Sequence, residues 1–545
     1  MAKNKGPLHP DAPLLLNNHR RPVTRRELIA QGFKAGSATV IGGSMLSLFA
    51  QSALGSLSPE IIAKRAECKI RSAGSGKIPF ICFDLAGGAN IAGSNVLIGQ
   101  KGGQLDFLST GGYSKQGLPA DMAPNASQAA NALLYDTSLG LAFHADSALL
   151  RGIKTRAAAM TQGMTNGAVI AARSENDTGN NPHNPMYGIN KAGADGSLMS
   201  LIGSVNSDSG GNSMSPSLMI NLEKRPTKVD RPEDVAGLVD VGDLKSLMPD
   251  TQDVVAVMEA MYKISDKKLD HVNPGTLVSG RDEKLEEMIR CGYVQSADYA
   301  DRFGSGTELV VQSDANIVGQ TNSIFGQEEF NSNGEYRKTA SVMKLVVNGY
   351  AGAGTITMGG FDYHTGDRST GETRDERAGN CIGACLEYAA RLGKPLMIYV
   401  FSDGSVFSNG MMDNSVAGRG KGVWTGDDQQ TASSFFLVYN PGSRPILIGG
   451  ESADPTALTA AQRVHQQIGY MRPSGDVETA SSPAANNVNL LVETVILNYM
   501  ALHGDAEKAK FGETFKGHGL GNSTLQDKMT AFRPLASLVD GLIPK

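Results

Sequence analysis

The chain is poor in tryptophan, cysteine and long apolar runs, and each shortage argues against a class of protein. Of its 545 residues, one is Trp and five are Cys. Five scattered cysteines do not suggest a disulfide framework, and an odd number leaves at least one thiol unpaired within the chain. No apolar run is long and hydrophobic enough to predict a membrane span. These shortages favour neither a small disulfide-stapled domain nor a multi-span membrane protein.

A strong excess of charge is also missing. The chain has 50 Lys and Arg against 55 Asp and Glu, a net charge of -5, and no long basic run beyond its N-terminal region. We therefore expect no nucleic-acid partner. Hydrophobic residues make up 40% of the chain, which is typical of a soluble globular protein with a sizeable core. The 65 glycines predict many tight turns and long loops.

The first 60 residues are expected to be an export signal and spacer. A Thr-Arg-Arg-Glu-Leu-Ile motif at 24–29 follows a polar, basic lead and precedes a moderately apolar stretch at 32–54 that is rich in Gly, Ala and Ser. This order is typical of a twin-arginine signal, with cleavage near Ala53. The alternative is a cytosolic N-terminal helix with adjacent arginines by chance. We expect a periplasmic or cell-envelope protein that meets the twin-arginine translocon during export. It would stay attached to the membrane only through an uncleaved signal.

Strands alternate with helices through much of the remaining chain. Apolar runs predict strands at 78–84, 148–155, 168–173, 217–222, 355–358, 395–401 and 434–439, and helical spacing predicts helices at 372–392, 457–470 and 488–503. This alternation favours an α/β fold with a mostly parallel sheet and helices on both faces. Charged helical segments at about 230–305 are expected to be an insertion in a single domain over 61–545.

Acidic side chains follow three of the predicted strands. Asp84 ends the first, Asp362 and His364 follow the strand at 355–358, and Asp403 follows the strand at 395–401. In a parallel sheet these strand ends meet at one edge. Carboxylates gathered there repel one another unless a cation neutralises them, and carboxylates with an imidazole are common ligands of a divalent metal. The pattern predicts one shared metal site. The other interpretation is that each Asp is an ordinary turn or capping residue.

These motifs resemble those of a known protein family. The Gly-Gly-Phe-Asp-Tyr-His turn at 359–364, the helix after it, the strand ending in Ser-Asp-Gly at 402–404 and the Asn-Gly at 409–410 are similar to motifs of twin-arginine-exported bacterial proteins of unknown function. That family belongs to the alkaline-phosphatase-like (sulfatase-like) superfamily. The segment at 84–90 matches the Gly-Gly-Asn-Asp end of the family's first strand. The resemblance implies an alkaline-phosphatase-like α/β fold with the site at the carboxyl edge of the sheet.

The expected metal ligands depart from the superfamily pattern at two places. Asp403 is followed by Gly404, where catalytic members often have a histidine. Where relatives carry an Asp-His-Gly turn, this chain reads Gly-Asp-Asp at 426–428. Asp427 or Asp428 is therefore expected to supply an oxygen ligand, which favours Mg, Ca or Mn over Zn. The other interpretation is that the metal site has been lost.

The expected catalytic residues depart from the pattern as well. His183 matches the histidine of the relatives' Ser-His pair, but Pro182 takes the place of the serine. Thr178 is the nearby candidate for the missing hydroxyl. Arg374 and Arg377, on the helix after the Asp-His turn, are placed either to meet an anionic substrate or to form salt bridges with neighbouring acids.

Two functions fit these residues. The first is an exported, metal-dependent hydrolase-like protein that acts on a phosphate or sulfate ester, with His183 assisting the leaving group or the metal. The second is a non-catalytic descendant of the same fold that binds a glycan, an anion or an envelope or secretion partner. A redox protein is a weaker third interpretation, because the chain has no Cys-x-x-Cys, haem-attachment or convincing dinucleotide motif.

Overall fold

The chain forms two compact units. The computed structural model describes residues 57–68, 70, 74–125, 133–174, 181–239, 250–271, 281–303 and 308–544. A helical unit comprises Met1–Ile70 and Val241–Ser305, and an α/β unit comprises Arg71–Asp240 and Gly306–Lys545. The expected export motif at 24–29 and Thr178 lie outside the described residues. None of the helices within the described ranges is both long and apolar enough to cross a bilayer.

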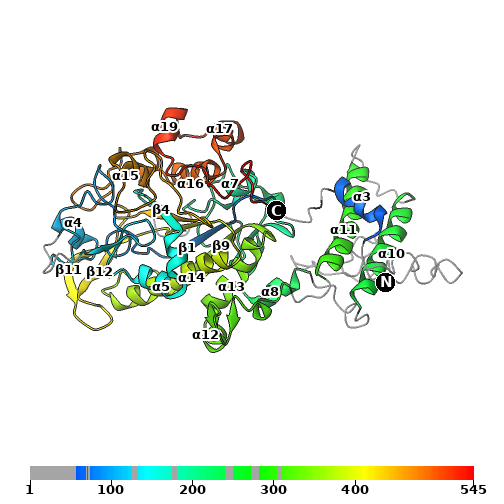
Figure 1. The fold of residues 1–545 in the computed structure, drawn as a ribbon, viewed down its shortest axis with the longest axis horizontal. Helices are drawn as coiled ribbons and strands as arrows, with labels where there is room; N and C mark the ends of the chain where they lie inside the picture. Colours follow the sequence, from blue (N-terminus) through cyan, green and yellow to red (C-terminus); the bar gives the residue numbers. More distant parts are fainter. Residues whose placement is uncertain are drawn as a thin grey trace, which may run out of the picture. The chain divides into compact units, whose positions relative to one another are not determined.

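An eight-stranded sheet forms the centre of the α/β unit (Figure 1). Its strand order is β14-β4-β13-β10-β1-β9-β5-β6. The strands are β1 Phe80–Leu85, β4 Thr165–Ile170, β5 Met199–Gly203, β6 Thr227–Lys228, β9 Ala351–Met358, β10 Leu396–Phe401, β13 Ser434–Tyr439 and β14 Gln467–Ile468. β13 runs antiparallel to both of its neighbours, and the other pairings are parallel. The predicted α/β class with a mostly parallel sheet is therefore confirmed.

Helices cover both faces of the sheet. α7 (Met186–Lys191) and α16 (Val488–Leu502) share a buried cluster with alternate strand residues, among them Phe80 and Ala353. The next residue on β9, Gly354, faces α13 (Gly334–Val347) on the other side, where a Cβ at this position would lie 2.7 Å from Val342. α14 (Ser369–Arg391) packs beside α13 and against α5 (Ala148–Arg156). Strands β1, β9, β10 and β13 are buried along their whole length, because both faces are covered.

Several predicted elements match the structure, and two predicted strands are wrong. The helices predicted at 372–392 and 488–503 are α14 and α16. The strand predicted at 148–155 is instead α5. Ser147 caps its first turn, because the Ser147 Oγ accepts a hydrogen bond from the Leu150 N–H (3.0 Å). Residues 217–222 form turns that lead into a short 3-10 helix, Leu222–Lys224, and not a strand. Short apolar runs do not distinguish a buried helix from a strand.

The helical unit contains α3 (Pro59–Glu67), α10 (Thr251–Leu269) and α11 (Arg281–Phe303). Ile61, Val254 and Val294 are among its core residues, and a disulfide joins Cys68, at the end of α3, to Cys291 on α11. The helical unit thus contains more than the expected insertion at 230–305, because α3, from the N-terminal part of the chain, packs with α10 and α11. The bond joins residues 223 positions apart, and the cysteine spacing did not indicate it.

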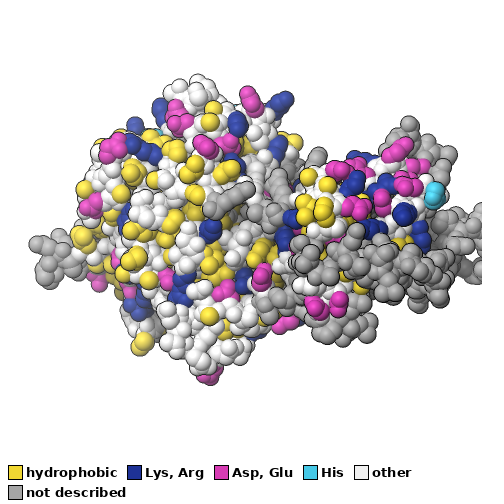
Figure 2. Space-filling view, turned by 45° about the vertical axis from the view of Figure 1, so that its right-hand side comes forward, with side chains coloured by type: hydrophobic (Ala, Val, Ile, Leu, Met, Phe, Trp, Pro, Cys, Tyr) yellow, Lys and Arg dark blue, Asp and Glu magenta, His cyan; other side chains and the backbone are white. Residues whose placement is uncertain are grey.

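Charged side chains of both signs are interspersed on one face of the molecule. Figure 2 shows Lys and Arg among Asp and Glu on the face turned to the viewer. This mixture agrees with the near-balance of 50 basic and 55 acidic residues in the chain.

Candidate metal centre

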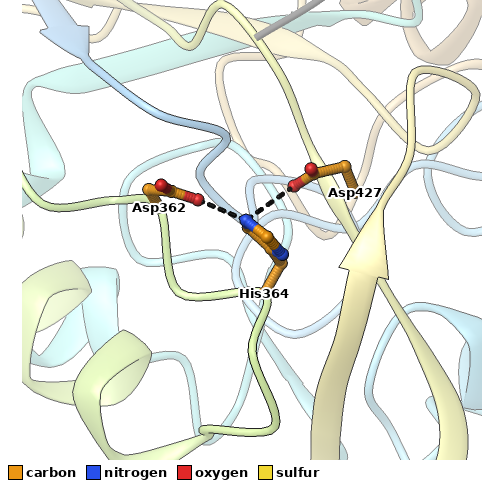
Figure 3. A group of neighbouring side chains, drawn as sticks. All are labelled: Asp362, His364 and Asp427. Carbon is orange, nitrogen blue, oxygen red and sulfur yellow. Dashed lines mark ion pairs between the residues drawn. The ribbon is translucent and has the colours of Figure 1, made fainter.

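Two acids and one imidazole meet at the carboxyl edge of the sheet. His364 Nε2 lies 2.6 Å from Asp362 Oδ1 and 3.6 Å from Asp427 Oδ1, and one ligand atom from each residue falls within 4.8 Å of the others (Figure 3). We call Asp362, His364 and Asp427 the three-residue group. Its side chains are partly exposed, at 62%, 29% and 43% respectively, so solvent reaches them.

The β-hairpin of β11 (Val406–Asp413) and β12 (Lys421–Asp427) brings Asp427 to this edge. Asp427 pairs with Val406, which follows Asp403 by three residues, so the hairpin returns the chain to the end of β10. The Gly366 N–H then donates to Trp424 O (2.8 Å), which ties the turn containing His364 to β12. On the other side, the Phe361 N–H donates to Ala86 O after β1 (3.2 Å). The turn is therefore anchored to both neighbouring segments.

The donor set of the three-residue group suits a divalent metal. It offers two carboxylate oxygens and one imidazole nitrogen, and three protein ligands leave coordination positions open for water or substrate. The oxygen-rich set favours a hard ion such as Mg, Ca or Mn. A metal and protons compete for these ligand atoms, because a ligand must be deprotonated to bind, and metal affinity should therefore fall at acid pH.

Asp84 lies at the same edge but is buried and fully hydrogen-bonded. Its Oδ2 accepts from the backbone N–H groups of Asn212 (2.7 Å) and Ser213 (2.9 Å) and from Thr357 Oγ1 (3.3 Å), and its Oδ1 accepts from Ser213 Oγ (3.1 Å). Burial raises the pKa of Asp84, although these hydrogen bonds oppose the shift. Its oxygens thus face donors of the loop before Met214 and not the three-residue group.

Asp403 is the second buried acid. Its Oδ1 accepts from the Gly87 N–H (2.9 Å), and its Oδ2 accepts from Asn212 Nδ2 (3.4 Å). Asn212 therefore links Asp403 to Asp84. The expected four-residue metal set is divided in the structure: Asp84 and Asp403 form an inner pair that Asn212 links, while Asp362 and His364 form the outer group with Asp427.

Gly87 separates the inner pair from the outer group. Besides binding Asp403, it has a φ of +124°, and a Cβ at this position would lie 2.6 Å from the Asp362 backbone nitrogen. Only glycine fits both the backbone conformation and the space. The ends of β1, β9 and β10 thus converge, with Gly87 in contact with both an inner and an outer acid.

Two other expected residues lie outside the three-residue group. Asp428 pairs with Lys115 (2.7 Å) and not with His364. His183 is 3% exposed and stacks on Phe401 with ring centroids 5.9 Å apart. Neither of its ring nitrogens has a hydrogen-bond partner among the described residues, and burial lowers its pKa to about 3. His183 is therefore neutral near pH 7, and it is not a member of the three-residue group.

A buried network under the Asp-His turn was not expected from the sequence. Tyr363, between the two ligands, donates its hydroxyl to Asp375 Oδ1 (3.1 Å) and accepts from the Asn90 N–H (2.7 Å). Asp375 Oδ2 accepts from Asn95 Nδ2 (2.6 Å). Burial raises the pKa of Asp375 to about 7. No local motif marks this network, because its members come together only through the fold.

The raised pKa of Asp375 predicts a pH dependence of stability. Its stabilising contribution is full below the ordinary carboxyl pKa of 3.8 and is lost as pH rises through about 7. In urea unfolding from pH 5 to 8, wild type should lose more free energy of unfolding than Asp375→Asn, which cannot titrate there. Equal slopes for the two proteins would show that Asp375 titrates normally.

Comparison of the chain with protein-family models, with curated proteins and with solved structures found no match. The functional conclusion therefore depends on the residues and their geometry.

Proposed function

We propose that this protein is an exported, metal-dependent hydrolase of a phosphate or sulfate ester. The three-residue group carries the proposal: one imidazole nitrogen and two carboxylate oxygens from separate segments lie within 4.8 Å at the solvent-exposed edge of the sheet. Asp362, His364 and Asp427 would hold the ion. A divalent metal at such a site polarises a phosphoryl or sulfuryl oxygen and generates a nucleophile at neutral pH.

The fold and the disulfide support this proposal. The mostly parallel sheet with helices on both faces is consistent with the alkaline-phosphatase-like superfamily that the motifs resemble. Disulfides persist in oxidising compartments such as the periplasm, so the Cys68–Cys291 bond agrees with export. In this proposal Asp84 and Asp403 position the strand ends. Asp403 accepts a hydrogen bond from the Gly87 N–H, and Gly87 packs against the Asp362 backbone.

The inner acid pair favours the second candidate, a non-catalytic binding protein. Asp84 and Asp403 both accept hydrogen bonds from N–H donors, and the position after Asp403 is Gly404 and not a histidine. A metal centre larger than the three-residue group would need these oxygens to exchange partners. A protein that kept the fold without the full centre would bind a glycan, an anion or an envelope partner.

Neighbouring aspartates provide a matched test of the metal centre. Asp427→Asn removes a charged ligand of the three-residue group, whereas Asp428→Asn changes a residue that pairs with Lys115. We expect Asp427→Asn to weaken Mn²⁺ binding at least ~10-fold, since even outer-shell changes have effects of that order. Asp428→Asn should bind Mn²⁺ as wild type does. Isothermal titration calorimetry measures both affinities.

The same proteins separate the two candidate functions. Hydrolysis of aryl phosphates or aryl sulfates that requires Mn²⁺ and fails in Asp427→Asn supports the enzyme. Stoichiometric Mn²⁺ binding without turnover of either substrate supports the binding protein. Equal Mn²⁺ affinity for Asp427→Asn and wild type would contradict the metal centre itself.

A further inference from the structure

Arg374 is a cation against the glycines that precede Asp362, and it has no carboxylate partner among the described residues. Three other cations near this end of α14 are paired, because Arg368, Lys421 and Arg151 all bind Glu372. The acids next to Arg374 in the chain are engaged elsewhere. Asp375 binds Tyr363 and Asn95, and Glu376 pairs with Arg151. The alternative role for Arg374, a salt bridge with these neighbouring acids, is therefore not supported.

The guanidinium of Arg374 lies against the turn that carries the metal ligands. Its Nη1 donates to Gly359 O (3.1 Å). It packs so closely on Gly360 that a Cβ there would overlap Nη1 and Cζ and lie 2.9 Å from Nε. Gly360 has a φ of +87° and precedes Asp362 by two residues. Within the described part of the chain, the buried Nε of Arg374 has no hydrogen-bond partner, and an unpaired positive charge thus lies against the turn two residues before Asp362.

Charge balance indicates what this guanidinium would bind. A divalent ion held by Asp362, Asp427 and neutral His364 leaves the centre with no net charge, because two carboxylates offset the ion. A phosphate or sulfate ester then needs a further positive group, and the planar guanidinium fork matches the oxygens of these anions. We propose that Arg374 binds the phosphoryl or sulfuryl oxygens of the substrate. This inference rests on the proposed function, and it makes Arg374 a substrate-recognition residue.

Binding of inorganic phosphate and sulfate to the Mn²⁺-loaded protein tests this role. Arg374→Gln should weaken phosphate binding roughly 10- to 100-fold, the loss typical of hydrogen bonds to charged groups. Arg377→Gln, three residues further along α14, removes the same charge and should bind phosphate as wild type does. Mn²⁺ affinity should be equal in all three proteins, and KM for an aryl ester should rise in Arg374→Gln only.

The outcomes distinguish this inference from the proposed function. Phosphate and Mn²⁺ affinities that both stay at the wild-type level in Arg374→Gln would overturn the role of Arg374 and leave the metal centre standing. Wild-type protein that binds no Mn²⁺ but loses phosphate binding in Arg374→Gln would support the role of Arg374 and contradict the metal centre. If Arg374→Gln fails to fold, Arg374→Lys replaces it, because lysine keeps the charge but lacks the fork. Phosphate affinity unchanged in Arg374→Lys and in Arg377→Gln would then overturn the inference.

Discussion

Replacing Glu372 by alanine should lower the free energy of unfolding by about 3–5 kcal/mol, the range for breaking a buried ion pair by removing one partner. Its Oε1 accepts from Arg368 Nη2 (2.7 Å) and Lys421 Nζ (2.8 Å), and its Oε2 accepts from Arg151 Nη2 (3.1 Å). The side chains of Arg368 and Lys421 are 1% and 0% exposed. Removal of Glu372 leaves two buried cations short of a counter-charge. Urea unfolding at pH 7 measures the loss.

A surface ion pair provides the control for Glu372→Ala. Arg533 pairs with Glu451 at 2.7 Å, but their side chains are 40% and 82% exposed, and Arg533→Ala should hardly change stability because water screens such pairs. If both variants unfold at the same urea concentration as wild type, the buried network does not stabilise the fold.

The loss of unfolding free energy in Glu372→Ala should also depend on pH. Burial raises the pKa of Glu372, but the charges of Arg368 and Lys421 outweigh burial, and its pKa lies below the ordinary 4.5. The carboxylate therefore stabilises the fold above pH 4.5, and this stabilisation is lost as pH falls through the lowered pKa. The difference between wild type and variant should shrink in strong acid.

The network around Glu372 also connects stability to the candidate metal centre. The Arg368 guanidinium lies over the Trp424 ring, 4.6 Å from its centroid, and Trp424 O accepts from the Gly366 N–H. Glu372 thus helps to hold β12, and with it Asp427, against the turn that carries His364. A loosened network should weaken Mn²⁺ binding as well as stability, although no member of the network is a proposed ligand.

The strand ends were predictable from the sequence because their signal is local. Apolar runs with an acid at the end or within four residues after it mark β1, β9 and β10, and parallel strands present their carboxyl ends at one edge. These runs alone are enough to place Asp84, Asp362 and Asp403 at the correct edge. The hairpin β11–β12 was not among the predicted strands. Asp427 could therefore be named as a substitute ligand only through the resemblance.

The division of the acids could not be predicted, because it depends on distant donors. Asp84 is satisfied by the backbone of residues 212 and 213, more than 100 positions away in the chain. Asp403 is satisfied by Gly87, 316 positions away. A single sequence shows which carboxylates reach an edge, but it does not show which N–H groups meet them there. The helix α5 was missed for a different reason, because its short apolar run is equally typical of a strand.

Replacing Gly379 by alanine should destabilise the protein by about 3 kcal/mol, the upper part of the range for overpacking a core. Gly379 lies where α14 packs against α5, and a Cβ at this position would overlap the Leu149 carbonyl oxygen and lie 2.9 Å from the carbonyl carbon. Gly152 lies on the facing helix, α5. A Cβ at Gly152 would likewise overlap Glu376 O and lie 2.6 Å from Asn380 N. The atoms in the way belong to backbone, so a rotamer change cannot relieve the overlap. Thermal and urea unfolding measure the loss.

Gly163→Ala is the matched control for Gly379→Ala. Gly163 ends α6 (Ala159–Gly163), and a Cβ there would meet nothing within 4 Å among the described residues. Its replacement should be neutral or stabilise by up to about 1 kcal/mol, because alanine restricts the unfolded chain. Equal stability of the two variants would show that the helices separate without penalty. If instead Gly379→Ala is destabilised, its Mn²⁺ affinity should fall too, since α14 also carries Glu372 and thereby supports β12.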